Sequence, residues 1–488
     1  MHGVIDMFCA IPPLAAARTP ARLLRCLLIA AALLAGLRPG ARQARADETR
    51  PNIVFIMTDD QSPTALGIAG NTQIRTPNMD RLAREGVYFT RAYTPLPQCA
   101  PGRATLLSGL YPHQLGVLSN NNATWNPDTP CFSRMLKEAG YQCGFVGKWH
   151  LGKPEKPQAG FDDYWVTLDL DAPKQNHYND PLIWIDGKST TETGELCEIL
   201  TTHATKFIDK CGDKPFLLWL NYKEPHVPLV PPASPRFEYD MNQLALPVSV
   251  TDDLSTKPAA QRDGFCHAQY RKRDERALKR ELATYYAMLT HVDESIGQLL
   301  NVLNQKNLTK KTLVIFMSDN GCLVGEHQMV RKGPALYEEL VRVPLIFRWP
   351  GVLKGSQKRE ALVSAMDLLP TIAAATGLKS PSGIVGRSFW PVVRGDETTL
   401  RDEVFLEYAE KASTEEQQPM AGVVTARFKY ARYINGNEEE LYDLQADPFE
   451  MKNLAKNSES AAQIKTLRGK VDGFLKTVEK PYWTPAAK

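Results

Sequence analysis

Two short apolar runs that lie far apart in the chain are followed by the same kind of residues, and this repeated design constrains the fold strongly. The runs span residues 53–57 and 313–317, and each precedes a pair of oxygen-bearing side chains: Asp59 with Asp60, and Asp319 with Asn320. An unbroken apolar run of this length is typical of a strand that is buried on both faces of a parallel sheet. Ligands of such sheets bind beyond the carboxyl ends of the strands. We therefore expect the two polar pairs to meet at one site.

Strand-like and helix-like segments alternate along most of the chain. Further strands are expected at 216–220 and 343–347, and helices at 78–86, 129–140 and 285–303. The alternation predicts an α/β fold with a large mixed, mostly parallel sheet sandwiched by helices, in a catalytic domain of residues 47–385. Beyond it, short strand candidates separated by turn residues precede a last helix at about 460–479. Residues 386–488 are expected to form a small C-terminal α+β subdomain with an antiparallel sheet plus helix.

The two polar pairs form an expected metal site. Carboxylate and amide oxygens suit Ca²⁺ or Mg²⁺, and no histidine cluster stands beside them in the sequence to favour zinc. A single pair of neighbouring aspartates is usually a helix cap or a surface pair. Two such pairs at the ends of two buried strands would repel each other strongly, and a divalent cation is the natural compensation.

The first 46 residues have the features of a secretory signal peptide. Arg18, Arg22 and Arg25 precede an apolar stretch at 26–37, and small residues around Ala46 offer a cleavage site. The apolar stretch is too short to span a bilayer. We therefore expect cleavage after Ala46 to remove residues 1–46. The mature protein is expected to be secreted or periplasmic and to have no stable membrane span.

The leader also accounts for the basic character of the whole chain. It holds six arginines and one aspartate, so its removal changes the formal net charge from +3 to −2. Nothing in the overall charge then favours a nucleic-acid partner. The remaining chain has seven cysteines, too few for a disulfide scaffold of this length. Cys197 and Cys211 either form a disulfide bridge or, like the others, are buried thiols.

Cys99 begins the most distinctive short motif. Cysteine, proline and arginine stand at positions 99, 101 and 103 of the run Cys-Ala-Pro-Gly-Arg. This Cys-x-Pro-x-Arg pattern resembles the signature of type I sulfatases, a family of the alkaline phosphatase-like superfamily, and the resemblance extends from Pro51 to about Asn453. One departure is Gly102, where the family usually has serine or alanine. Glycine loosens the segment that a modifying enzyme must bind, but the three fixed positions are intact and we expect modification.

Three further segments carry cations or imidazoles toward the same site. The strand-like segment 140–150 is expected to present Lys148 and His150 on one face, because side chains alternate along a strand, and it resembles the second motif of the family. His226 stands in a loop framed by two prolines. Lys332 follows the second polar pair, and the resemblance implies that it reaches the same site.

The resemblance implies a role for each of these residues. Cys99 would be oxidised to formylglycine (3-oxoalanine) by a formylglycine-generating or anaerobic maturation enzyme, and the hydrated aldehyde would be the nucleophile. Arg103 would orient the hydrate, and His150 would act as a base on its second hydroxyl. The sulfate oxygens would be bound by Lys148, His226 and Lys332. The ligands of Ca²⁺, or less favourably Mg²⁺, would be Asp59, Asp60, Cys99, Asp319 and Asn320.

The substrate is less constrained by the sequence. Asn176 and His177 open a polar, aromatic loop that would contact a sugar or form an ordinary capped turn, and His327 is a further expected substrate contact. A basic cluster at 271–273 and 279–280 would meet a sulfated polymer or form the solvated start of a helix. We expect a secreted sulfatase acting on a sulfated polysaccharide or oligosaccharide, with a small aryl or choline ester less favoured.

Two other classes of protein stay open at this point. A phosphate or phosphonate ester hydrolase of the same superfamily would share the strand-end acids without needing a modified Cys99. A catalytically silent protein would bind sulfated glycan without releasing sulfate. Substitution of Cys99 by serine separates the first alternative from a sulfatase, because only the sulfatase depends on the modification.

Overall fold

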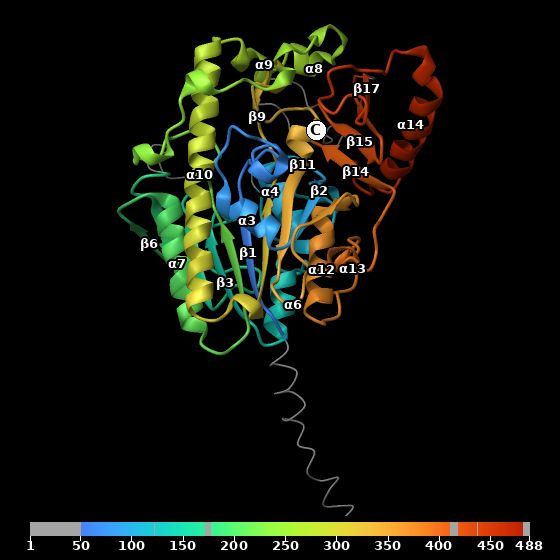
Figure 1. Ribbon diagram of the computed structural model, residues 1–488. Coiled ribbons are helices and arrows are strands. Elements are labelled where there is room, and N and C mark those ends of the chain that lie inside the picture. Colours follow the sequence, from blue (N-terminus) through green and yellow to red (C-terminus); the bar gives the residue numbers. More distant parts are fainter. Residues whose placement is uncertain (1–49, 122, 171–176, 410–417, 437, 482–488) are drawn as a thin grey trace, which may run out of the picture. The chain divides into compact units, whose positions relative to one another are not determined.

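The central β-sheet of the computed structural model has eleven strands and mixes parallel with antiparallel pairs (Figure 1). The structure describes residues 50–121, 123–170, 177–409, 418–436 and 438–481. The expected signal peptide lies outside these ranges, so its cleavage stays a prediction. Among the described residues, no helix is long and apolar enough to cross a membrane.

The parallel strands occupy the middle of this sheet. In spatial order the strands are β12 (Gln357–Arg359), β2 (Val87–Tyr93), β11 (Arg342–Arg348), β8 (Thr312–Ser318), β1 (Asn52–Thr58), β7 (Phe216–Asn221), β3 (Gln142–Gly147), β4 (Tyr164–Leu168), β5 (Leu182–Ile185) and β6 (Lys188–Thr191), with β13 (Val363–Ser364) also pairing with β2. The run from β8 to β4 is parallel throughout. β11 is antiparallel to both of its neighbours, and β5 pairs antiparallel with β4 and β6. The predicted mixed, mostly parallel sheet is confirmed.

Helices cover both faces of the sheet (Figure 1). The α-helices described before the C-terminal sheet are α3 (Pro77–Arg84), α4 (Cys99–Ser108), α5 (Pro112–Leu115), α6 (Phe132–Glu138), α7 (Leu196–Cys211), α8 (Ala259–Arg262), α9 (Phe265–Tyr270), α10 (Glu275–Gln305), α11 (Glu338–Val341), α12 (Leu368–Ala375) and α13 (Trp390–Arg394), of which α8 and α9 lie beyond the end of the sheet. The predicted helix at 285–303 is part of the longer α10, which begins ten residues earlier and already buries Leu278 and Leu282 in its first turns. Asp274 caps this helix by accepting from the N–H of Ala277.

Successive residues of β1 belong to two different cores. Phe55 packs with residues of α4, α6, α12 and α13, whereas Val54 and Ile56 pack with residues of α3, α7 and α10. Since side chains alternate across a strand, a central strand covered on both faces must be apolar at every position. This explains why the run at 53–57 contains no polar residue.

A smaller antiparallel sheet follows, as predicted. It consists of β14 (Glu403–Tyr408), β15 (Met420–Thr425), β16 (Phe428–Tyr433) and β17 (Glu439–Asp443), and is followed by α14 (Ala461–Leu475). One face of this sheet packs on α14, and the other packs on residues that include Tyr93 of β2. Residues 51–488 form one unit by their contacts, and the boundary at residue 385 stays a prediction.

The seven cysteines of the described residues are buried free thiols. Cys197 and Cys211 stand near opposite ends of α7. An α-helix rises 1.5 Å per residue, so they are roughly 20 Å apart and cannot form a bridge. Of the two interpretations that the sequence allowed, the buried thiol is confirmed.

Candidate active site

The two polar pairs meet beyond the carboxyl ends of β1 and β8. The last residues of these strands, Thr58 and Ser318, are register partners, so the residues that follow emerge at the same edge of the sheet. The backbone N–H of Asp60 donates to Asp319 Oδ1 at 3.2 Å and joins the two segments. Carboxylate oxygens of Asp59, Asp60 and Asp319 lie within 4.8 Å of one another, and all three side chains are almost completely buried.

The donor set at this edge fits a hard divalent cation. Besides the three carboxylates it includes Asn320, whose Nδ2 donates to Asp60 Oδ1 at 2.7 Å and whose buried Oδ1 has no hydrogen-bond partner among the described residues. Burial and the charge of Asp59 raise the pKa of Asp319, because carboxylates this close disfavour one another's ionised forms. An all-oxygen set of this kind is typical of Ca²⁺ or Mg²⁺ sites.

Three cations balance these carboxylates, two of them buried and the third, Lys332, partly exposed. Arg103 of α4 donates Nε–H to Asp319 Oδ2 at 3.0 Å, and its Nη2 lies 2.9 Å from the same oxygen. Lys148 and Lys332 each form an ion pair with one aspartate of the pair that follows β1. Burial opposes the charging of both lysines, but the paired aspartates raise their pKa values, so both stay protonated. A bound divalent cation would therefore give the site a net positive charge, which suits an anionic substrate.

Cys99 is the first residue of α4 and lies against this charged cluster. Its Sγ is 3.1 Å from Asp59 Oδ1 and 3.0 Å from Lys332 Nζ, and the side chain is fully buried. Burial and the charge of Asp59 raise the pKa of the thiol. The unmodified thiol is therefore protonated at neutral pH, and a protonated thiol is a poor nucleophile.

Gly102 marks a close approach between α4 and the segment that carries Asp319. A Cβ at this position would lie 2.8 Å from the backbone carbonyl oxygen of Asp319 and 3.2 Å from Thr94 Oγ1. The first distance is shorter than real Cβ contacts, so a side chain here must displace the backbone. The departure from the family pattern thus has a physical reason in this chain, because glycine permits this packing.

Replacing Gly102 with serine, the residue that the family pattern favours, is predicted to reduce activity. The added Cβ would push the backbone of Asp319, misplacing a predicted metal ligand and lowering kcat/KM roughly tenfold, with a destabilisation of about 1–3 kcal/mol. Steady-state kinetics and thermal melting test this, with the modified fraction of Cys99 measured separately by mass spectrometry. Gly469→Ser is the matched control, because nothing lies within 4 Å of a Cβ there. Parental kinetics and stability for Gly102→Ser would contradict the prediction.

Two neutral imidazoles face the same site. Lys148 and His150 lie in the loop after β3, which ends at Gly147, so the predicted strand alternation is wrong, although both residues line one cleft. Burial and the charge of Lys148 lower the pKa of His150 well below its ordinary value and that of His226 to about 3. Nδ1 of His150 is buried without a hydrogen-bond partner in the described part of the chain. Nδ1 of His226 lies 2.6 Å from the carbonyl oxygen of Val227.

Two residues that the sequence analysis did not assign are Lys223, which lines the cleft, and its hydrogen-bond partner Tyr178. The volume of the cleft is about 320 Å³. Lys223 Nζ donates to Tyr178 Oη at 2.8 Å, and the Tyr178 hydroxyl donates to the backbone carbonyl of His226. This chain of contacts supports the loop of His226. Both residues stand in segments that the sequence had marked as functional, but a lone lysine or tyrosine carries no signal that it will be buried.

The three expected substrate contacts have different outcomes. Asn176 lies outside the described residues. His177 lines the cleft, and its contact with substrate stays a prediction. The prediction for His327 is wrong, because its side chain is fully buried, stacks on Tyr337 at 3.6 Å and has Nδ1 2.6 Å from Asp252 Oδ2. Burial opposes protonation of this ring, but hydrogen bonds to carboxylates raise the pKa of His327 to about 9, as expected for a structural cation.

Comparisons with known proteins agree with this geometry. A sulfatase family model matches residues 51–378, and a model of the N-sulphoglucosamine sulphohydrolase C-terminal region matches residues 325–476. An N-acetylglucosamine-6-O-sulfatase from Bacteroides thetaiotaomicron is 31% identical, over 88% of this chain and 86% of that protein. An ulvan-active sulfatase from Formosa agariphila is 29% identical, over 88% of this chain and 81% of that protein. A solved structure in complex with its substrate D-glucosamine-2-N,6-O-disulfate has a TM-score of 0.81 and 29% identity, over 89% of this chain and 100% of that one.

The fold and the buried cluster of carboxylates and cations define a hydrolase of the alkaline phosphatase-like superfamily. Within that superfamily, the chain belongs to the type I sulfatase family and is a sulfuric ester hydrolase. The resemblance on which the sequence analysis depended is thereby confirmed.

Proposed function

We propose that this sulfatase is exported and removes sulfate from a sulfated polysaccharide or oligosaccharide, using a formylglycine made from Cys99 and a bound Ca²⁺. Relatives named for N-acetylglucosamine-6-O-sulfate and for ulvan support the glycan class, as does the similar structure bound to a disulfated glucosamine. The leader with Arg18, Arg22 and Arg25 supports export.

The placement of Cys99 is the observation that carries this proposal. The residue stands at the centre of the charged cluster, within reach of Asp59 and Lys332, but burial keeps its thiol protonated. A buried neutral thiol among three cations is poorly suited to attack an ester. Oxidation to a hydrated aldehyde would supply two hydroxyls on one carbon, one to attack sulfur and one whose deprotonation releases the sulfate.

The same modification bears on the metal. Removing the sulfur would leave only oxygen donors beside Asp59, Asp60, Asp319 and Asn320, which favours Ca²⁺ over softer metals. When bound, the ion would stabilise negative charge that develops on oxygen at the reacting centre. The buried Oδ1 of Asn320, which has no hydrogen-bond partner among the described residues, supports its assignment as a ligand.

The remaining residues divide between binding the anion and moving protons. Lys148 and Lys332 are fixed ammonium groups that would hold sulfate oxygens, and Arg103 holds its aspartate partner and the start of α4 in place. Lys332, which stays protonated, would protonate the departing sugar oxygen. His150 is neutral, and its Nδ1 has no hydrogen-bond partner in the part of the chain that the structure describes, so it can accept the proton of the second hydroxyl.

The mass of the peptide that contains Cys99 tests this proposal. After co-expression with a formylglycine-forming enzyme, we expect the mass of an aldehyde in place of the thiol, and elemental analysis should find calcium in the purified protein. A control sulfatase matured in the same cells shows that the modifying enzyme is active. An intact thiol in this chain beside a modified control would contradict the proposed nucleophile.

A further inference from the structure

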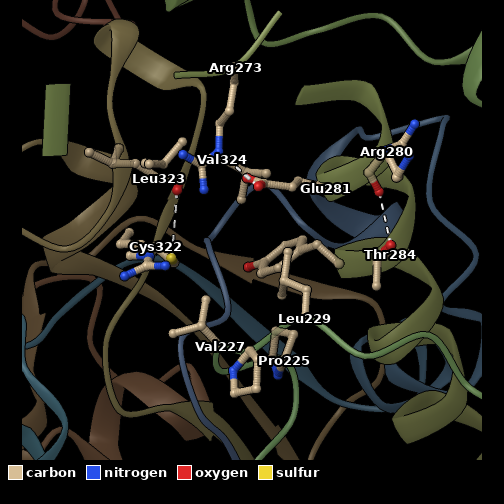
Figure 2. Close-up of a pocket in the computed structure, with 14 residues that line it drawn as sticks. Pro225, Val227, Leu229, Arg273, Arg280, Glu281, Thr284, Cys322, Leu323 and Val324 are labelled. Carbon is tan, nitrogen blue, oxygen red and sulfur yellow. Dashed lines mark hydrogen bonds and ion pairs between the residues drawn. The ribbon is translucent and has the colours of Figure 1, made fainter. Parts of the chain in front are cut away.

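A second cavity adjoins the catalytic cleft. It has a volume of about 270 Å³ and shares Val227, Pro228 and Arg331 with the cleft that contains Lys148 and His150. Figure 2 shows Arg273 and Arg280 in the upper part of this cavity, with Val227 and Leu229 below them. We call it the arginine cavity. The residues proposed to act on the scissile sulfate do not line it, so it belongs to a different part of the substrate path.

The charge of the arginine cavity is strongly positive. Three arginines line it, namely Arg273 just before α10, Arg280 near the start of α10 and Arg331 of β10 (Val330–Arg331), together with a single acid, Glu281. That acid is already paired, because Arg273 Nε lies 2.8 Å from Glu281 Oε1. Arg280 and Arg331 are exposed and form no ion pair with any residue in the described ranges. These two lining arginines therefore have no counter-ion among the described residues.

The backbone places Arg331 between the catalytic cleft and the arginine cavity. It pairs with Leu323 in the short hairpin of β10 and β9 (Leu323–Val324) and has φ of 73°, in the left-handed region that an arginine seldom adopts. Such a conformation is strained and persists only where the surroundings enforce it. The residue that follows is Lys332, so the same turn delivers one cation to the wall that the two cavities share and the next to the ion pair with Asp60.

The remaining wall of the arginine cavity is apolar. Pro225, Val227, Leu229 and Val324 contribute to it. Tyr285 also lines it, but its hydroxyl is already used, since it donates to the carbonyl of Asp60 and accepts from the N–H of Ser62. Apolar walls with a few fixed charged groups are typical of a ligand pocket. A sugar ring, with its apolar faces and charged substituents, matches this combination.

We propose that the arginine cavity is a subsite for a second anionic group of the glycan, a sulfate or a carboxylate on a unit next to the one that is desulfated. This inference rests on the proposed function. Arginine presents a fork of N–H donors that matches the oxygens of both anions. The members of the basic cluster at 271–273 and 279–280 thus have different roles. Arg273 and Arg280 line the cavity, whereas Lys279 forms an ion pair with Glu275 at 2.9 Å.

The test compares Arg280→Gln with the parental enzyme on three disaccharides that share the scissile sulfate. One has no second anion, one has a second sulfate, and one has a uronic acid carboxylate. We expect kcat/KM to fall roughly tenfold for at least one of the doubly charged substrates, as for the loss of a charge-assisted hydrogen bond, and to stay unchanged for the singly charged one. The substrate that loses rate identifies the anion. Arg276→Gln is the control, because this exposed arginine is one turn away on α10 but does not line the cavity.

A binding measurement keeps this inference separate from the proposed function. Calorimetry compares the affinity of the same disaccharides for Cys99→Ala and for the double variant Cys99→Ala with Arg280→Gln, which needs no turnover. We expect weaker binding of a doubly charged disaccharide to the double variant. Equal affinities, or equal loss of kcat/KM for all three substrates, would overturn the subsite. Failure of the parental enzyme to release sulfate from any of them would instead contradict the proposed function.

Discussion

Replacing Cys99 with serine is expected to reduce sulfate release by roughly 10⁴-fold or more, comparable to the loss of a catalytic nucleophile elsewhere. The substitution is nearly isosteric, so the ion pairs of Asp59 and Lys332 should persist. A serine hydroxyl offers one oxygen on its carbon, where a hydrated aldehyde offers two. It can accept the sulfate but has no second hydroxyl whose deprotonation would expel it. Initial rates with a sulfated disaccharide, measured with the mass of the peptide to confirm an intact serine, test this expectation.

The same variant separates a sulfatase from a phosphoester hydrolase with this fold. An enzyme that attacks through an ordinary hydroxyl would keep part of its activity with serine at this position, and Cys99→Ala would then be far less active than Cys99→Ser. We expect the two variants to be equally inactive. Melting temperatures close to that of the parental protein would show that loss of activity does not come from unfolding. Sulfate release by Cys99→Ser within tenfold of the parental rate would contradict the role of the modification.

The position of the site follows from the sequence for a simple physical reason. The runs at 53–57 and 313–317 are apolar at every position because β1 and β8 are central strands with helices on both faces. Parallel neighbours end at the same edge, so the register of Thr58 with Ser318 is enough to bring the two polar pairs together. Apolar patterning and strand direction thus predict the carboxylates and their shared edge.

Other parts of the site depend on packing that a sequence does not display. Lys223 and Tyr178 acquire their roles only when separate loops meet at His226. His327 stands close to Lys332 in the sequence, and its imidazole is of a type that can contact a substrate. Its side chain is nevertheless buried against Tyr337. Nor does the spacing of Lys148 and His150 report that both lie beyond the end of β3. In each case the deciding quantity is burial, which depends on the tertiary structure.

Replacing His150 with alanine is expected to lower steady-state turnover by roughly 10²- to 10⁴-fold, the usual contribution of a positioned base. His150 suits this role because burial and the charge of Lys148 lower its pKa well below its ordinary value, so the ring is neutral and able to accept a proton. The first half of the reaction does not need this proton transfer. We therefore expect a burst of about one desulfated product per enzyme, followed by slow turnover, with the sulfate retained on the peptide that contains residue 99.

Two measurements distinguish a base from a residue that merely fills space. Added imidazole should restore part of the slow phase in His150→Ala without changing the burst, because a free base can diffuse into the space left by the ring. Cys99→Ala should show no burst under the same conditions. His150 has a left-handed φ of 61°, and alanine adopts this conformation less readily than asparagine, so His150→Asn serves as the variant that preserves the loop. If His150→Asn turns over at the parental rate, the proton is removed by another group and the assignment of His150 is wrong.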